Sequence, residues 1–176
     1  MTAALAYRET LPLAWRPAIA DTLPAAVVEQ DLRVLAAIAA LAERTRVEPD
    51  APGAAEFERL HHKVDLMIEL LGALLRSMQG LPDAVPLQLS GGGLRWTPDG
   101  AVPPPGTLVD VSVYLHPAAP APLRWLGDMV AGEAGAAELR WRPMPEALLS
   151  ALEQYVFIRH RRSVAGARSP VHRGEA

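Results

Sequence analysis

The stretch FERLHHKVDLMIELLGALLRSM, residues 57–78, decides how this chain is organised. Its apolar residues recur after three and then four positions, at Phe57, Leu60, Val64, Met67, Leu71, Leu74 and Met78. This is the a and d pattern of a coiled-coil seam over about three heptads. Charged residues occupy the other side of the helix, at Glu58, Arg59, Asp65, Glu69 and Arg76. The pattern predicts a long amphipathic helix that assembles with other helices.

Two arrangements would cover this seam. One is an antiparallel hairpin with the apolar segment of residues 24–46 inside a single chain. The other is self-association of several chains into a helical bundle. With Phe57 at position a, the e and g positions include Ile68, Leu70 and Leu75, which widen the apolar stripe beyond a two-helix seam. The width favours self-association, as a dimer of hairpins or a tetramer.

The composition indicates a folded chain without affinity for nucleic acid. Half of the 176 residues are hydrophobic, 21% are charged, and mean hydropathy is slightly positive. The net charge of −3 gives no general attraction to nucleic acid or to anionic membranes. Cysteine is absent, which excludes disulfides, thiolate zinc sites and thiol nucleophiles.

Export, membrane insertion, metal binding and catalysis lack the expected sequence signals. The N-terminus has no signal-peptide pattern, and the longest apolar run, residues 34–42, is too short to span a bilayer. We therefore expect a cytoplasmic protein. His61 and His62 are adjacent and point to different sides of a helix, so we expect no metal site. Without HExxH, GxSxG or phosphate-loop motifs, we expect no enzyme and no catalytic residues.

The rest of the chain divides into a short strand, helices and a β-rich block. Leu11, Leu13 and Trp15 alternate around Pro12 like a strand at a sheet edge. A helix is expected over residues 24–46, and the heptad helix is expected to end at Gly80. Turn clusters then separate five expected strands, at residues 85–89, 94–96, 108–115, 123–131 and 138–142. A final helix over residues 145–162 and a loose polar tail over residues 164–176 complete the chain.

The β-rich block resembles PilZ domains. VPLQLSGGGL at residues 85–94 resembles their signature strand and turn, and VDVSVYL (109–115) and LGDMV (126–130) resemble later strands. ALLSALEQYVFIRHRR (147–162) resembles their closing helix. The resemblance implies an α+β fold: a small antiparallel six-stranded β-barrel with a C-terminal helix. The barrel would comprise residues 1–23 and 82–163, with residues 24–80 as an inserted helical hairpin for oligomerisation and 164–176 as a flexible tail.

Many PilZ domains bind cyclic di-GMP through an RxxxR segment and a (D/N)xSxxG turn. Arginine pairs with phosphates and stacks on guanine, and a tight Ser-Gly turn lets the ligand approach the backbone. Here Ser90 and Gly93 match the turn motif, but Gln88 replaces Asp or Asn, and no RxxxR pair is present. Arg8 and Arg16 are eight residues apart. They are either solvated surface charges or a relocated clamp, and Ser90–Gly93 is either an ordinary hairpin turn or a ligand turn.

The resemblance therefore implies a non-catalytic signalling adaptor with weak or no ligand binding. It would oligomerise, as a tetramer, and act with a protein partner in bacterial surface motility or cyclic di-GMP-related regulation. The alternative is a functional cyclic di-GMP receptor whose altered site contains Arg8, Arg16, Gln88, Ser90 and Gly93. We expect no cofactor besides that ligand. Arg159, Arg161 and Arg162 are expected to complement the end of the last helix, or to form an anion patch.

Overall fold

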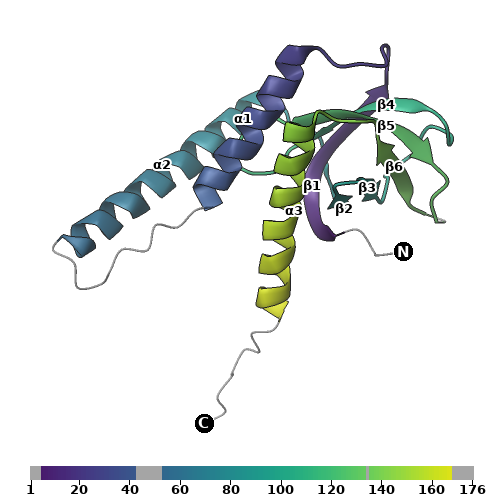
Figure 1. The fold of residues 1–176 in the computed structure, drawn as a ribbon. Helices are drawn as coiled ribbons and strands as arrows, with labels where there is room; N and C mark the ends of the chain where they lie inside the picture. Colours follow the sequence, from purple (N-terminus) through teal and green to yellow (C-terminus); the bar gives the residue numbers. More distant parts are fainter. Residues whose placement is uncertain (1–4, 43–52, 134, 168–176) are drawn as a thin grey trace, which may run out of the picture.

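The computed structural model describes residues 5–42, 53–133 and 135–167, which contain three helices and six strands (Figure 1). In chain order these are β1 (Ala6–Pro17), α1 (Ala25–Ala42), α2 (Ala54–Gln79), β2 (Ala84–Ser90), β3 (Gly93–Trp96), β4 (Leu108–Val113), β5 (Leu123–Val130), β6 (Ala137–Trp141) and α3 (Glu146–Ala167). The predicted fold class is confirmed, and so is the order of elements. Helix α3 includes residues 164–167, which were expected to belong to the tail, while residues 168–176 lie outside the described residues.

The six strands close into an antiparallel barrel in the order β1-β2-β3-β6-β5-β4. Alternate residues of each strand point into the barrel, because side chains of a β-strand alternate between its two faces. In β2 the inward set is Val85, Leu87 and Leu89, and in β4 Val109, Val111 and Val113 are nearly inaccessible to solvent. The core is therefore built mainly from aliphatic side chains.

Strand β1 was expected at a sheet edge, and this prediction was wrong. Residues 6–12 of β1 pair with β2, and residues 13–17 pair with β4, so β1 links the two ends of the sheet. Pro12 lies where the pairing changes from one neighbour to the other, a place where an interrupted ladder tolerates proline. Closure of the barrel removes the edge that the proline seemed to mark.

Helices α1 and α3 pack on one side of the barrel. Helix α3 lies against β1 and β2, and Leu148, Leu152 and Val156 bury completely in the shared core. Helix α1 lies against α3 and β5, and its buried Val34 and Leu35 belong to the same core. The apolar face of α1 therefore packs on the barrel side and does not cover the heptad stripe of α2.

Helix α2 projects from this packed body (Figure 1). It touches the body at Gly72, where an added Cβ would lie 2.5 Å from the carbonyl oxygen of Pro117 and 3.0 Å from the Cα of Ala118. Ile68 and Leu75, about one turn to either side of Gly72, are half-buried. A glycine at this position lets the helix approach the loop after β4 more closely than any other residue would allow.

Candidate functional site

Most of the exposed large hydrophobic side chains in the described part of the chain lie on α2. Its seven a and d residues, which we call the seam, are between 44% and 75% exposed: Phe57, Leu60, Val64, Met67, Leu71, Leu74 and Met78. Leu66 and Leu70 extend the exposed stripe beside the seam. The hairpin arrangement would have covered the seam within one chain, whereas here it faces solvent. Contiguous apolar patches of this kind mark interaction surfaces.

The side of α2 that meets its own chain differs from the seam. Gly72 and the e positions Ile68 and Leu75 lie next to one another around the helix, and they face the body of the molecule. The seam lies beside them and points outward. The apolar e positions therefore have a partner within the chain, and the a and d positions remain for other helices.

A second surface lies on the outside of the barrel, across β1, β2 and β3. Arg8 is opposite Gln88, and Gln88 is opposite Arg95, so the three side chains form a row on adjacent strands. Arg8 Nε donates a hydrogen bond of 3.3 Å to Gln88 Oε1. We call this row, together with the Ser90–Gly93 turn, the barrel face. Arg95 was missed in the sequence analysis, although the two-residue turn at Gly91-Gly92 sets the register that places it opposite Gln88.

The turn of the barrel face is held by its own hydrogen bonds. Ser90 Oγ accepts hydrogen bonds from the backbone N–H groups of Gly92 (3.3 Å) and Gly93 (3.1 Å), and donates to the carbonyl of Gly93 (3.1 Å). A Cβ on Gly93 would lie 2.2 Å from the carbonyl oxygen of Leu139 in β6. Ser90 and Gly93 thus have structural roles that account for their presence without a ligand.

The structure does not bring Arg16 to the barrel face. Arg16 lies eight residues further along β1, about 26 Å of extended strand, and its neighbour is β4. Its Nε and Nη2 donate to the buried Asp110, at 3.1 and 2.9 Å, and Arg124 donates to the same carboxylate. Burial alone would raise the pKa of Asp110, but the hydrogen bonds from the two arginines outweigh it and hold that pKa below its ordinary value. Arg16 is therefore occupied by an ion pair.

Carboxylates reduce the positive charge of the barrel face. Arg95 forms an ion pair with Glu133, and it lies opposite Glu138 on β6. The side chain of Glu153, from α3, approaches Gly91 so closely that a Cβ there would lie 2.8 Å from it. A phosphate-bearing ligand at this turn would meet negative charge from several sides.

The three arginines of α3 do not form one anion patch. Arg159 is paired with Glu9 and lies over the ring of Tyr7, and Arg161 lies over the ring of Phe157. Arg162 Nη2 donates a hydrogen bond of 3.0 Å to the carbonyl of Ala42, at the end of α1. Thus Arg162 complements a neighbouring helix, not its own.

Within residues 5–42, 53–133 and 135–167, no group of three or more His, Asp or Glu side chains is arranged to hold a metal ion. No helix in the same residues is long and apolar enough to cross a membrane.

Comparisons with known proteins place the fold. Among solved structures, a pathogenic protein from Xanthomonas campestris is similar over 94% of this chain and 93% of its own, with 27% identity and a TM-score of 0.66. That protein is described as a new tetrameric PilZ domain self-assembled via an unusual helical bundle. The Bacillus subtilis inhibitor of motility MotI/DgrA matches 47% of this chain and 42% of its own, with 15% identity and a TM-score of 0.36, a likeness too weak to bear on function.

No curated protein matches the chain. The family model of the atypical PilZ domain, described as a cyclic di-GMP receptor, matches residues 32–169. This match covers the barrel from β2 to β6, helix α3, helix α2 and most of α1. The chain therefore belongs to the atypical PilZ domain family.

Proposed function

We propose that this protein is a non-catalytic signalling adaptor that assembles through α2 into a homotetramer. Residues 24–80 would serve as the assembly insert, and residues 1–23 and 82–163 as the barrel with its closing helix. The observation that carries the proposal is the exposure of the whole seam on a helix that projects from the body.

The energy of the seam supports assembly. Complete burial of a Val, Leu, Phe or Met side chain stabilises by roughly 1.5–3 kcal/mol relative to exposure. Seven such side chains, each about half exposed in one chain, leave several kcal/mol to be gained on association. The breadth of the stripe favours more than two helices. The tetrameric state described for the similar Xanthomonas campestris protein gives the number that we propose here.

Light scattering after size exclusion tests the assembly. We expect the mass of a tetramer for the wild-type chain. Leu71→Asp should give a folded monomer, because Leu71 is already 56% exposed in one chain but would become a buried, unpaired charge in a bundle. His62→Asp, on the opposite side of α2, is the control and should leave the mass unchanged. A wild-type mass equal to one chain, independent of concentration, would refute the proposal.

A cyclic di-GMP receptor is the second candidate. The row of Arg8, Gln88 and Arg95 favours it, because two guanidiniums beside an amide could bind phosphate and a guanine edge. The carboxylates around the row, and the missing RxxxR pair, favour weak or no binding. Calorimetric titration with cyclic di-GMP separates the candidates. If binding heat is measured, Arg8→Ala should abolish it and Arg16→Ala should not. If no binding heat is measured, the adaptor is the only candidate that remains.

As an adaptor, the tetramer would present several barrels on one helical stem. Linked sites raise the apparent affinity for a partner without new contacts. From the family resemblance, we propose that the partner is a cytoplasmic protein of motility or cyclic di-GMP-related regulation. A partner captured by the wild-type tetramer should dissociate faster from the Leu71→Asp monomer. Equal dissociation rates would argue against avidity.

A further inference from the structure

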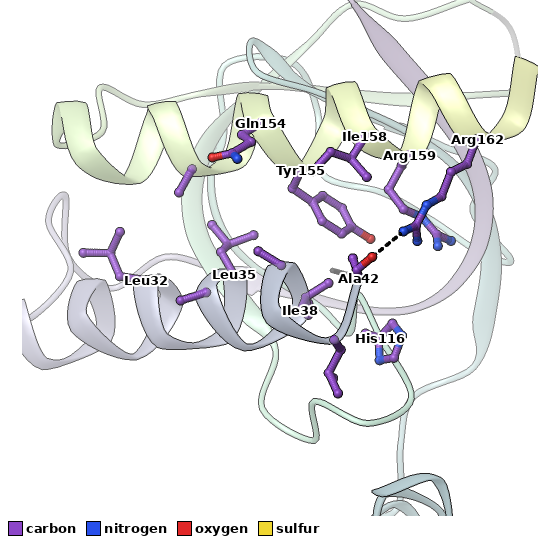
Figure 2. Close-up of a pocket in the computed structure, with 14 residues that line it drawn as sticks. Leu32, Leu35, Ile38, Ala42, His116, Gln154, Tyr155, Ile158, Arg159 and Arg162 are labelled. Carbon is purple, nitrogen blue, oxygen red and sulfur yellow. Dashed lines mark hydrogen bonds between the residues drawn. The ribbon is translucent and has the colours of Figure 1, made fainter. Parts of the chain in front are cut away.

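A cavity of about 370 Å³ lies between α1 and α3, separate from both the seam and the barrel face (Figure 2). Its walls are apolar along most of its length, with side chains from both helices: Leu32, Leu35, Ile38, Leu41, Ala151 and Ile158. Close-packed protein interiors contain few voids larger than a water molecule. A cavity of this size, lined mainly by apolar groups, has the dimensions of a small-molecule site.

One end of the cavity is polar. Figure 2 shows the Tyr155 hydroxyl, Arg159 and Arg162 at the same end, with His116 below them. The Tyr155 hydroxyl donates to the carbonyl of Leu115, at 3.2 Å. The charge of Arg159 is compensated by Glu9. The polar end is therefore built from fixed groups of α3 and of the loop after β4.

Arg162 differs from Arg159 in having no carboxylate partner among the described residues. Its hydrogen bond to the Ala42 carbonyl uses one N–H group, whereas a guanidinium carries five donors. The bond complements the C-terminal end of α1, a structural role that leaves the charge of Arg162 without an anion among the described residues. The remaining donors can bind a carboxylate, which guanidinium groups contact through two parallel hydrogen bonds.

We propose that this cavity binds an amphipathic carboxylate, that is, a free fatty acid whose alkyl chain lies between α1 and α3 and whose carboxylate contacts Arg162. The apolar walls match an alkyl chain, and the cationic end matches its head group. A peptide fits less well, because its backbone N–H and C=O groups would lack partners among the apolar walls.

Calorimetric titration of the full chain with dodecanoate, below its micelle concentration, tests the proposal. We expect saturable binding of dodecanoate and much weaker binding of dodecanol and of dodecyltrimethylammonium. Arg162→Gln should weaken binding roughly tenfold to a hundredfold, the range for hydrogen bonds to charged groups. The matched control is Arg161→Gln on the same helix, because Arg161 lies over Phe157 and does not line the cavity. Arg162→Lys keeps the charge but loses the two parallel hydrogen bonds, so its affinity should lie between those of the wild type and Arg162→Gln.

A second pair of variants tests where the alkyl chain of the fatty acid binds. Ala39→Leu places extra atoms in the cavity wall and should abolish binding. Leu71→Asp changes the seam of α2 and should leave binding unchanged. The proposal is overturned if dodecanoate does not bind, if dodecanol binds equally well, or if Arg161→Gln and Arg162→Gln have the same effect. Binding that survives Ala39→Leu but is lost in Leu71→Asp would place the fatty acid on the seam and would also overturn it.

Discussion

Asp31→Asn should make this protein more stable at alkaline pH. Asp31 lies on α1, is only 1% exposed, and accepts a hydrogen bond of 3.0 Å from the backbone N–H of Arg124 in β5. Its second carboxylate oxygen is buried and has no hydrogen-bond partner in the described structure. Burial raises the pKa of Asp31 from 3.8 to about 7, against the opposing effects of the Arg124 hydrogen bond and charge. The Asp31 carboxylate links α1 to the barrel, but its burial is unfavourable when it is ionised.

The magnitude follows from this pKa. A rise from 3.8 to about 7 corresponds to about 4 kcal/mol, at about 1.4 kcal/mol per pKa unit. Between these values the folded chain holds a proton that the unfolded chain has released. The free energy of unfolding therefore falls as the pH rises through this window, and it levels off above about pH 7. Asparagine keeps an acceptor for the backbone N–H of Arg124 and cannot ionise. The free energy of unfolding of the variant therefore does not fall in this pH window.

Urea unfolding of both proteins at about pH 5 and about pH 8 measures the difference. Relative to wild type, the variant should gain about 3 kcal/mol between the two pH values, because at about pH 5 the wild type has already lost the part of its stability that belongs to the rise from pH 3.8 to about pH 5. One protein concentration must be used throughout, because assembly makes stability concentration-dependent. Asp21→Asn, on the exposed segment before α1, is the control and should show no such gain. A difference between wild type and Asp31→Asn that does not change with pH would refute the reasoning.

Three further predictions concern close contacts and buried hydrogen bonds. Gly93→Ala should destabilise by at least about 1–3 kcal/mol in urea unfolding, because the new methyl group would overlap a β6 carbonyl at 2.2 Å. Gly72→Ala should also destabilise, although alanine favours helices by up to about 1 kcal/mol, because its methyl group would lie 2.5 Å from the Pro117 carbonyl. Tyr7→Phe should cost about 1 kcal/mol, and Tyr155→Phe should cost more by the same measurement. The Tyr155 hydroxyl joins two buried groups at 3.0 and 3.2 Å, whereas that of Tyr7 joins one.

Much of the fold could be predicted from local patterns. The three-and-four spacing of the seam gave α2 almost to the residue, and the turn clusters separated β2 to β6 at nearly their observed bounds. The barrel-face motif was also visible, since Gln88, Ser90 and Gly93 lie within six residues. Arg95 could have been added from the hairpin register. These features are local, because periodicity and turn chemistry act between near neighbours in the chain.

The remaining features depend on which distant segments meet. The sequence offered Arg8 and Arg16 as equal candidates, and only strand pairing decided that Arg8 lies beside Gln88 and Arg16 beside Asp110. Nothing local to Asp31 indicates its hydrogen bond to the backbone of Arg124, which depends on the position of β5 against α1. By itself, then, the sequence determined the elements and the presence of a seam, because each rests on a short-range repeat. Only the tertiary structure decided that the seam faces outward and that a cavity lies between α1 and α3. Both features depend on how the helices pack around the closed barrel.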